Sequence, residues 1–250
     1  MTPDWTPLDA ELALWQRADL TLPLWWRDDD ATAPTPALDR LHDLSVETGL
    51  PVHLAVVPEP ALPALADVTR DREMLIPVVH GWAHRNHQNP DSKKSEFGAD
   101  RSAELALDDA QRGLTRMRDL FGDDLIPMFV PPWNRISEEV IAGLPRLGYS
   151  ALSTFMPRNA QNAAPGLERI NTHLDPIDWR GTRGLVNANT LITQVTAQLR
   201  DRREGRVDNG EPYGLLTHHL VHDDAIWQFT QELVTRLIRG PGQPWTMPRQ

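Results

Sequence analysis

Continuous apolar runs alternate along the chain with segments whose apolar residues recur at helical spacing. The runs, which are typical of strands covered on both faces, occupy residues 20–26, 51–57, 74–79, 126–130, 149–154 and 213–217, and residues 167–173 form a weaker candidate strand. Helices are predicted at residues 1–19, 36–49, 61–69, 103–121, 137–147, 190–203 and 225–238. Strand and helix alternate about seven times. This predicts an α/β fold of parallel strands joined by crossover helices, either closed as a barrel or left open.

Length and composition narrow the class of protein. The 250 residues show no change of composition, so we expect one domain over residues 1–250 with its core at about 20–240. The absence of cysteine excludes a disulfide framework, a thiolate nucleophile and a cysteine zinc site. A net charge of -10 argues against nucleic acid or an anionic membrane as partner. Because residues 1–14 carry three carboxylates and no run could span a bilayer, we expect a cytoplasmic protein.

Polar clusters follow or end five of the predicted strands. They lie at residues 28–30, 80–87, 131–135, 175–179 and 218–219. In a parallel α/β sheet the functional site lies at the carboxyl ends of the strands, so these clusters are expected on one rim.

The second cluster contains three histidines, His80, His84 and His87, spaced by four and then three residues. On a helical turn all three would share one face. Two imidazoles and a carboxylate can form a metal site with open coordination positions. Histidines also occur at this spacing by chance, so the interpretation depends on the other clusters.

The first cluster is a run of three aspartates, Asp28, Asp29 and Asp30, directly after an apolar strand. Buried carboxylates are costly unless they are solvated, paired or bound to metal. The alternative is an acidic loop or helix cap ahead of Pro34. His53, inside an apolar run, is interpreted as a core histidine rather than a ligand.

In their order, these motifs resemble the polysaccharide deacetylase superfamily (NodB-like, carbohydrate esterase family 4) over about residues 22–222. The family's Asp-Asp pair is matched within residues 27–30, and its His-(Ser/Thr)-x-x-His at residues 80–84, with Gly81 at the hydroxyl position. Its Asp-x-x-Asp-Trp is intact at residues 175–179, and its Leu-x-His lies at residues 216–218. The resemblance implies a distorted (β/α) barrel and a divalent metal.

The resemblance also implies roles for particular residues. The implied metal ligands are Asp30, His80 and His84, with zinc as the favoured ion. Asp29 would be the general base and His218 the general acid. The remaining roles are those of the Trp133 backbone N–H, in the oxyanion hole, and of Asp178, which would hold His218 in its protonated form.

The sequence departs from the family pattern in its third motif, Arg-x-Pro-Tyr, which reads Val-Pro-Pro-Trp at residues 130–133. Either Arg27 or Arg135 could replace the missing arginine, which in the family orients the catalytic aspartate. The three aspartates leave the first motif ambiguous by one residue, and Asp28 with Asp29 is the alternative pair.

The roles of two further histidines and of four tryptophans have more than one interpretation. His87 is an additional ligand, a group behind the ligands or a surface residue. Strand alternation directs His218 into the pocket and His219 away from it. The tryptophans form walls for a sugar ring or brace the strand ends; they are Trp26, Trp82, Trp133 and Trp179.

The expected function is that of a metal-dependent hydrolase removing an acetyl or other acyl group from an N-acetylated sugar or polysaccharide fragment. The expected partner is thus a small molecule or an oligosaccharide. One alternative is a hydrolase of a non-peptide C–N bond in a small metabolite. The other is a catalytically silent relative that binds carbohydrate, which the missing arginine suggests.

Overall fold

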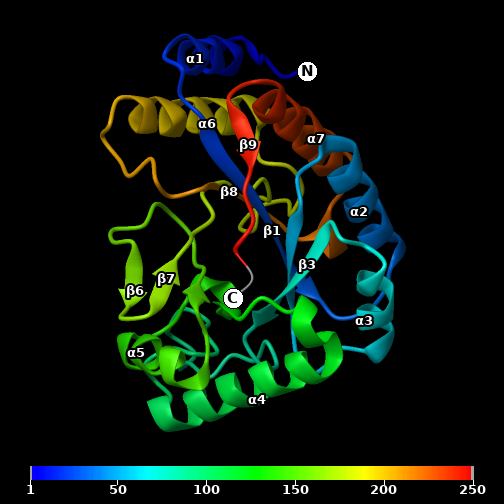
Figure 1. The fold of residues 1–250 in the computed structure, drawn as a ribbon, viewed down its shortest axis with the longest axis vertical. Helices are drawn as coiled ribbons and strands as arrows, with labels where there is room; N and C mark the ends of the chain where they lie inside the picture. Colours follow the sequence, from blue (N-terminus) through cyan, green and yellow to red (C-terminus); the bar gives the residue numbers. More distant parts are fainter. Residues whose placement is uncertain (1, 249–250) are drawn as a thin grey trace.

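A mostly parallel β-sheet forms the centre of the computed structural model, which describes residues 2–248 (Figure 1). Its strands are β1 (Leu22–Ala31), β2 (Val52–Val56), β3 (Leu75–His80), β4 (Met128–Val130), β5 (Ala151–Leu152), β6 (Asn162–Ala164), β7 (Leu167–Arg169), β8 (Tyr213–Thr217) and β9 (Gly242–Pro244). They follow the order β6-β7-β5-β4-β3-β2-β1-β8, and β9 pairs with the start of β1. All these pairs are parallel except β6 with β7.

A short segment after β7 connects the two ends of this sheet. Thr172 bridges to Phe155 beyond β5, and Leu174 bridges to Leu215 in β8. The backbone N–H of Leu216 donates to the carbonyl of Leu174 at 2.8 Å. The sheet therefore closes irregularly on itself, and the predicted α/β class with a distorted barrel is confirmed.

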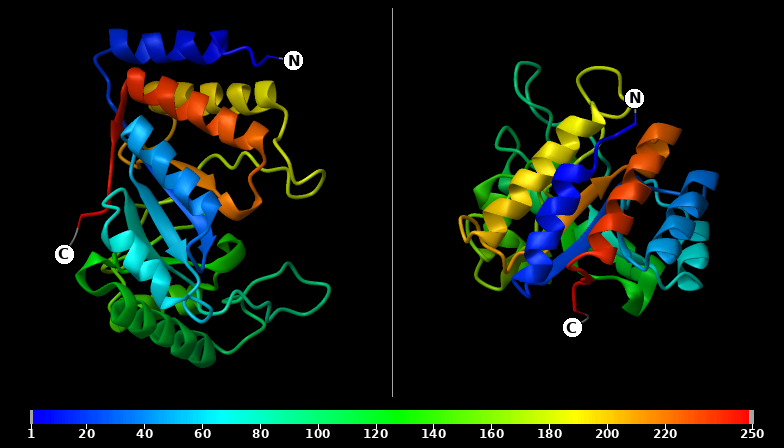
Figure 2. Two further views of the ribbon diagram at one scale, coloured as in Figure 1. Left: turned by 90° about the vertical axis from the view of Figure 1, so that its right-hand side faces the viewer. Right: turned by 90° about the horizontal axis from the view of Figure 1, so that it is seen from above.

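Helices cover the outside of the sheet, and in Figure 2 α1 forms an additional layer over α6 and α7. The α-helices are α1 (Thr6–Arg17), α2 (Pro36–Thr48), α3 (Pro63–Arg70), α4 (Ala103–Phe121), α5 (Glu138–Leu147), α6 (Ala188–Arg203) and α7 (Asp224–Arg239). Three short 3-10 helices are η1 (Gly122–Asp124), η2 (Pro132–Asn134) and η3 (His219–Val221). Trp15 of α1 is fully buried, so this helix contributes to the hydrophobic core.

Local signals in the sequence explain where α2 begins and ends. The Thr35 side chain accepts a hydrogen bond from the Leu38 N–H at the first turn, and proline occupies the first helical position. Gly49 ends the helix in the left-handed conformation, with φ 71°. Both ends were expected from the sequence within one residue.

Strand β1 extends through the three aspartates, so the expectation that they follow the strand was wrong. Parallel partners continue on both sides, because Asp28 is paired with Leu54 of β2 and with Thr217 of β8. The backbone groups are thus satisfied beyond the apolar residues. Only after Asp28 does the register shift, next to Asp30, whose φ is 76°. Alternation along β1 therefore places Asp28 and Asp29 on opposite faces, whereas the irregular backbone at Asp30 brings its side chain into the same cavity as Asp29.

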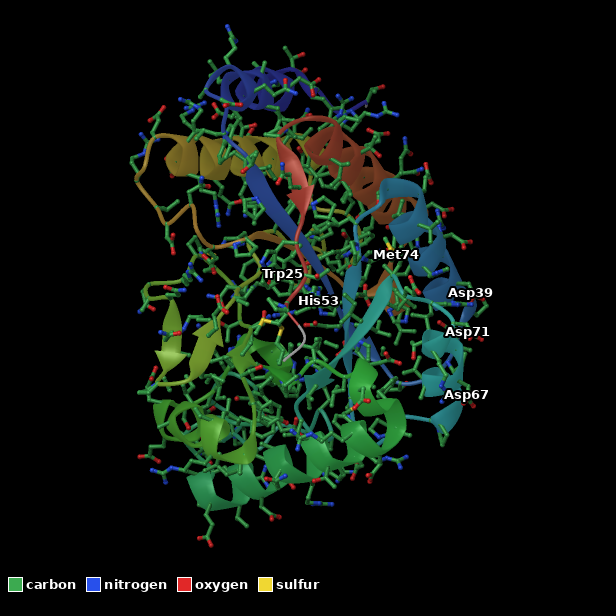
Figure 3. The ribbon with its side chains drawn as sticks, viewed as in Figure 1. Trp25, Asp39, His53, Asp67, Asp71 and Met74 are labelled. Atoms are coloured by element: carbon green, nitrogen blue, oxygen red, sulfur yellow. The ribbon has the colours of Figure 1, made fainter. Side chains whose placement is uncertain are left out.

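The C-terminal segment contains β9 and closes the amino end of the barrel. The Trp245 N–H donates to the carbonyl of Leu24 at 2.8 Å, and the Met247 N–H donates to Nε2 of His53 at 3.2 Å. Figure 3 shows Trp25 and His53 beside this end of the chain. His53 is fully buried, as expected of a core histidine.

Two other findings bear on the predictions from sequence. Residues 157–166, for which the sequence predicted neither helix nor strand, contain the short strand β6, which forms an antiparallel pair with β7. Within residues 2–248, every helix falls short of the length and apolar character that crossing a bilayer requires.

Candidate metal and catalytic site

The carboxyl ends of β1 and β3 bring three expected ligands together. The Oδ1 atom of Asp30 lies 3.1 Å from Nε2 of His80 and 3.3 Å from Nε2 of His84. One potential ligand atom from each of the three residues lies within 4.8 Å of the others. The parallel sheet thus places side chains 50 or more positions apart in the sequence at one point.

The hydrogen bonding of His80 tests whether this group fits a cation. Its Nδ1 lies 3.0 Å from the carbonyl oxygen of Val130, which can only accept, so Nδ1 carries the proton. In the neutral ring, Nε2 then presents a lone pair toward the Asp30 carboxylate. Two acceptors that face each other require a proton or a cation between them. A carboxylate with two imidazoles is a donor set that zinc accepts, so the residues fit the expected metal.

Electrostatics within the group also favour a shared positive charge. Burial disfavours ionisation of Asp30, but the hydrogen bond and charge of His80 outweigh it and hold its pKa well below the usual range. Burial alone would lower the pKa of His80, but the carboxylates of Asp29 and Asp30 raise it overall. Burial and the charge of His80 lower the pKa of His84.

The segment after His80 is not a helical turn, and that expectation was wrong. Gly81 and His84 both have left-handed backbone conformations, with φ of 59° and 54°. The fully buried carboxylate of Glu96 accepts hydrogen bonds from the backbone N–H groups of Trp82, Ala83 and Arg85, at 3.2, 2.8 and 3.4 Å. These bonds satisfy N–H groups that have no regular secondary structure to pair with, so the turn wraps around Glu96.

Glu96 is a residue that the sequence analysis missed, because it lies in a polar loop without any motif. Its Oε2 would be only 2.4 Å from a Cβ at position 81, and Cδ of Pro132 would be 2.5 Å away. A side chain at Gly81 would therefore displace the carboxylate. The position of the Glu96 carboxylate behind the turn therefore depends on glycine at residue 81, where the family has a hydroxyl residue.

His87 lies outside the group of ligand atoms. Its side chain is exposed, and its backbone N–H donates to the carbonyl of Ser95 at 2.9 Å. Of the open interpretations, the structure agrees with that of a surface residue.

Asp29 is held by Arg27, two positions earlier on the same face of β1. Arg27 Nε donates to Oδ1 at 2.8 Å and one terminal nitrogen donates to Oδ2 at 3.0 Å, which is a two-pronged contact. The guanidinium is fully buried and also donates to Ser153 Oγ and Asn134 Oδ1, each at 2.7 Å. Arg135 instead donates to the carbonyl of Lys94 at 2.7 Å. Of the two arginines expected as replacements, Arg27 and not Arg135 therefore contacts Asp29.

Asp28 points to the opposite face of β1 and lies outside the pocket. Its Oδ1 is 2.5 Å from Nδ1 of His219, and its Oδ2 accepts from Thr217 Oγ1 at 2.6 Å. Burial alone would raise the pKa of Asp28, but the charge and hydrogen bond of His219 lower it overall. Because Asp28 is bound to His219 away from the pocket, only Asp29 and Asp30 of the three aspartates face the pocket. His219 is directed away from the pocket, as expected.

His218 borders the same pocket, but its acidic neighbour is not the expected one. The rings of His218 and Trp179 meet edge to face, with centroids 4.7 Å apart. Asp175 lines the pocket and accepts from Trp179 Nε1 at 2.7 Å. Burial raises the pKa of Asp175, and the charge of His218 offsets part of that increase.

Asp178 is used differently, so its expected contact with His218 is corrected. Its carboxylate accepts from the backbone N–H groups of Gly181 and Thr182, at 3.0 and 3.2 Å. These bonds organise the loop that follows. A carboxylate three and four residues before exposed N–H groups is more readily bound by its own turn than by a distant histidine.

Trp133 contributes both its ring and its backbone. The ring centroid lies 4.3 Å from that of His84. Its N–H donates no hydrogen bond to any residue in the described range 2–248, so it is free to bind a ligand. Trp179 also lines the pocket, whereas Trp26 is buried and donates to Thr217, and Trp82 stacks with Arg112.

The backbone around the site is strained. Four of its residues other than glycine have left-handed φ values, namely Asp30 (76°), His84 (54°), Trp133 (58°) and Asn134 (57°). Each such residue costs of order 1 kcal/mol or more and persists only where the surroundings enforce it. Their concentration here supports a functional role for this rim.

Asp29, His218 and the expected metal ligands border one cavity of about 720 Å³. It is lined by Asp29, Asp30, His80, His84, Trp133, Asn134, Arg135, Phe155, Asp175, Ile177, Trp179, Arg180, Arg183, Gln194, Leu216 and His218. The volume suits a ligand of one or two sugar rings.

Comparison with known proteins identifies the fold. No family model and no curated protein matches the sequence. A family 4 carbohydrate esterase from Streptomyces lividans, solved in complex with acetate, is similar at TM-score 0.54 and 12% identity, covering 91% of this chain and 94% of its own. A putative polysaccharide deacetylase from Mycobacterium smegmatis is similar at TM-score 0.57 and 16% identity, covering 86% of this chain and 81% of its own.

A family 4 pseudoenzyme from Bacillus anthracis is also similar, at TM-score 0.53 and 12% identity, covering 88% of this chain and 61% of its own. The chain therefore has the fold of the family 4 carbohydrate esterases. The resemblance to the polysaccharide deacetylase superfamily is confirmed at the level of the fold.

Proposed function

We propose that this protein is a metal-dependent hydrolase that removes an acetyl or other acyl group from an amine of a sugar or oligosaccharide. One observation carries the proposal. A ligand group that fits a cation, an aspartate fixed by a buried arginine and a histidine all open into the same cavity. Structures with this fold include an esterase in complex with acetate.

Asp30, His80 and His84 would hold the divalent ion, for which zinc is the favoured candidate. When bound, such an ion supplies Lewis-acid polarisation of the amide carbonyl and acidifies water. The protein residues would orient the substrate and move the protons.

Asp29 would accept the proton from the attacking water. The two-pronged contact with Arg27 fixes both carboxylate oxygens, so the base cannot rotate away from the cavity. The free N–H of Trp133 would donate to the oxygen that becomes negative as the carbonyl is attacked.

His218 would donate a proton to the leaving nitrogen. The edge contact with Trp179 fixes its ring, and Asp175 supplies a carboxylate in the same part of the pocket. We assign the positioning role to Asp175, since Asp178 is engaged by its own turn.

Two alternatives remain to be distinguished. The first is hydrolysis of a different non-peptide C–N bond in a small metabolite, which would use the same groups. The second is a silent carbohydrate-binding protein, as the pseudoenzyme neighbour illustrates. Against the second, Arg27 supplies the contact whose absence from the third motif suggested it.

The test begins with elemental analysis of the purified protein and of the His80→Ala/His84→Ala variant. We expect a divalent metal in the first and its loss from the second. A wild-type protein that stays empty after zinc addition would contradict the metal assignment.

Acetate release from N-acetylglucosamine oligomers is the second measurement. Asp29→Asn should lower kcat by about 100-fold to 10,000-fold, the usual contribution of a general base. Asp119→Asn, on the exposed side of α4, is the matched control and should retain full activity. If Asp29→Asn retains wild-type kcat, another group is the base.

A further inference from the structure

Three arginine side chains line the cavity without a carboxylate partner. They are Arg135, Arg180 and Arg183. The only side-chain hydrogen bond among them in residues 2–248 runs from Arg135 to the carbonyl oxygen of Lys94. Arginines elsewhere on the surface are often paired, as Arg40 is with Asp224 at 2.7 Å.

The carboxylates of the cavity are already engaged. Asp29 is bound by Arg27, Asp30 faces two imidazoles, and Asp175 accepts from Trp179 and from the Ile177 N–H. None of them forms an ion pair with the three arginines. In a chain of net charge -10, the rim of this cavity therefore presents unneutralised positive charge.

The loop that carries two of these arginines is ordered by Asp178. Besides its side-chain bonds, the Asp178 N–H donates to the carbonyl of Gly184 at 2.9 Å, and its own carbonyl accepts from the Arg183 N–H at 3.0 Å. Arg183 has φ 60°, a conformation that turns the chain sharply. The third arginine belongs to the segment after β4, so the charges reach the cavity from separate loops.

The geometry points to a substrate that carries an anionic group, a carboxylate or a phosphate, close to the acylated amine. This inference rests on the proposed function, and it names the substrate class of the same site. Guanidinium groups bind carboxylates and phosphates through bidentate hydrogen bonds. Several positive charges on the rim of a cavity also increase the rate at which an anion enters it.

The experiment compares three probes in the metal-loaded enzyme: neutral N-acetylglucosamine, its 1-phosphate and the carboxylate-bearing N-acetylmuramic acid. The anionic group of each charged probe is attached to a carbon next to the one that bears the amide. We expect kcat/KM at least 10-fold higher for one of the two anionic probes, and which one it is distinguishes phosphate from carboxylate. The Arg180→Ala/Arg183→Ala variant should lose about 10-fold on that probe and less than twofold on the neutral one.

Arg146→Ala is the matched control, since it removes an exposed positive charge from the end of α5, outside the cavity lining. It should change kcat/KM less than twofold on every probe. Equal kcat/KM for neutral and anionic probes, or an equal loss on both in the double variant, would overturn the inference.

Binding to the Asp29→Asn variant, measured by calorimetry, separates this inference from the proposed activity. Tighter binding of an anionic probe, lost when Arg180 and Arg183 are also replaced, supports the inference even if no acetate is released. In that case only the proposed reaction fails. Equal affinity for neutral and anionic probes contradicts the inference whatever the activity.

Discussion

The two ends of the barrel interior use the same strand for opposite purposes. At the amino end, Trp25 of β1 packs against His53 and Trp245, with ring centroids 5.3 and 6.0 Å away. At the carboxyl end, Arg27 and Asp29 form a buried ion pair beside the cavity. These three β1 side chains share one face and are two residues apart, yet the first closes the barrel and the others serve its site.

Protonation is controlled differently at the two ends. Burial dominates at the closed end, where it lowers the pKa of His53 to about 4. At the open end, charged partners override burial, and the pKa of His80 is raised. An apolar end can stabilise the barrel alone, whereas the polar end depends on each charge keeping its partner.

The largest effect should come from breaking the ion pair at the polar end. Arg27→Met leaves the buried carboxylate of Asp29 unpaired, so we expect a loss of about 3–5 kcal/mol in the free energy of unfolding and at least a 100-fold loss of kcat. Denaturant unfolding and acetate release measure the two. Arg27→Lys keeps the charge without the two-pronged contact, so it should recover most of the stability but little activity. Unchanged stability in Arg27→Met would disprove the role of the pair.

Acidification should act through the closed end. His53 has a folded pKa of about 4 and an unfolded value near 6.5, so the unfolded state binds more protons between these limits. Stability should therefore fall by about 3 kcal/mol as the pH is lowered from 6.5 to 4. His53→Gln can still donate to the Trp26 carbonyl and accept from the Met247 N–H. Its unfolding free energy should lack this part of the pH dependence, and an identical pH profile would exclude His53.

The turn at the polar end can be tested without changing any metal ligand. Glu96→Gln places an NH₂ group against backbone N–H donors, so metal affinity should fall about 10-fold to 100-fold, as for other residues that orient ligands. Titration calorimetry with zinc measures it. Glu59→Gln is the matched control, because it removes only a more exposed contact with Arg85 of the same turn. Equal affinities in the two variants would argue against Glu96 as a positioning residue.

The smallest effect should follow from opening the closed end. Trp245→Ala removes a partly buried ring that packs on Trp25 and His53, and we expect a loss of about 1–2 kcal/mol with kcat/KM unchanged. Thermal unfolding and acetate release check both expectations. A selective loss of activity would mean that the two ends are coupled.

Local patterns were sufficient for much of the fold. The expected helix at residues 103–121 coincides with α4, because its capping serine and apolar spacing are both local. The choice of Asp29 and Asp30 over Asp28 and Asp29 came from the family resemblance and not from a local pattern, and the structure places the chosen pair in the cavity and Asp28 on the opposite face of β1.

The errors arose where distant residues compete for the backbone. Glu96 takes the N–H groups that a helix after His80 would have used, and β9 pairs with β1 from more than 200 residues away. Asp178 was expected beside His218, but Asp175 lines the same pocket instead. Asp178 is bound within its own turn, and the motif alone does not reveal those hydrogen bonds. The compartment and the absence of nucleic-acid partners stay predictions from composition.

The pairing of β1 has a consequence for the order of events during synthesis. β1 is synthesised well before two of its partners, β8 and β9, which begin at Tyr213 and Gly242. Contacts so distant in sequence form slowly. Until β8 and β9 have been synthesised, the edge of β1 that pairs with them stays unpaired. Nascent chains that stop before β8 should therefore be more prone to aggregation than chains released at full length.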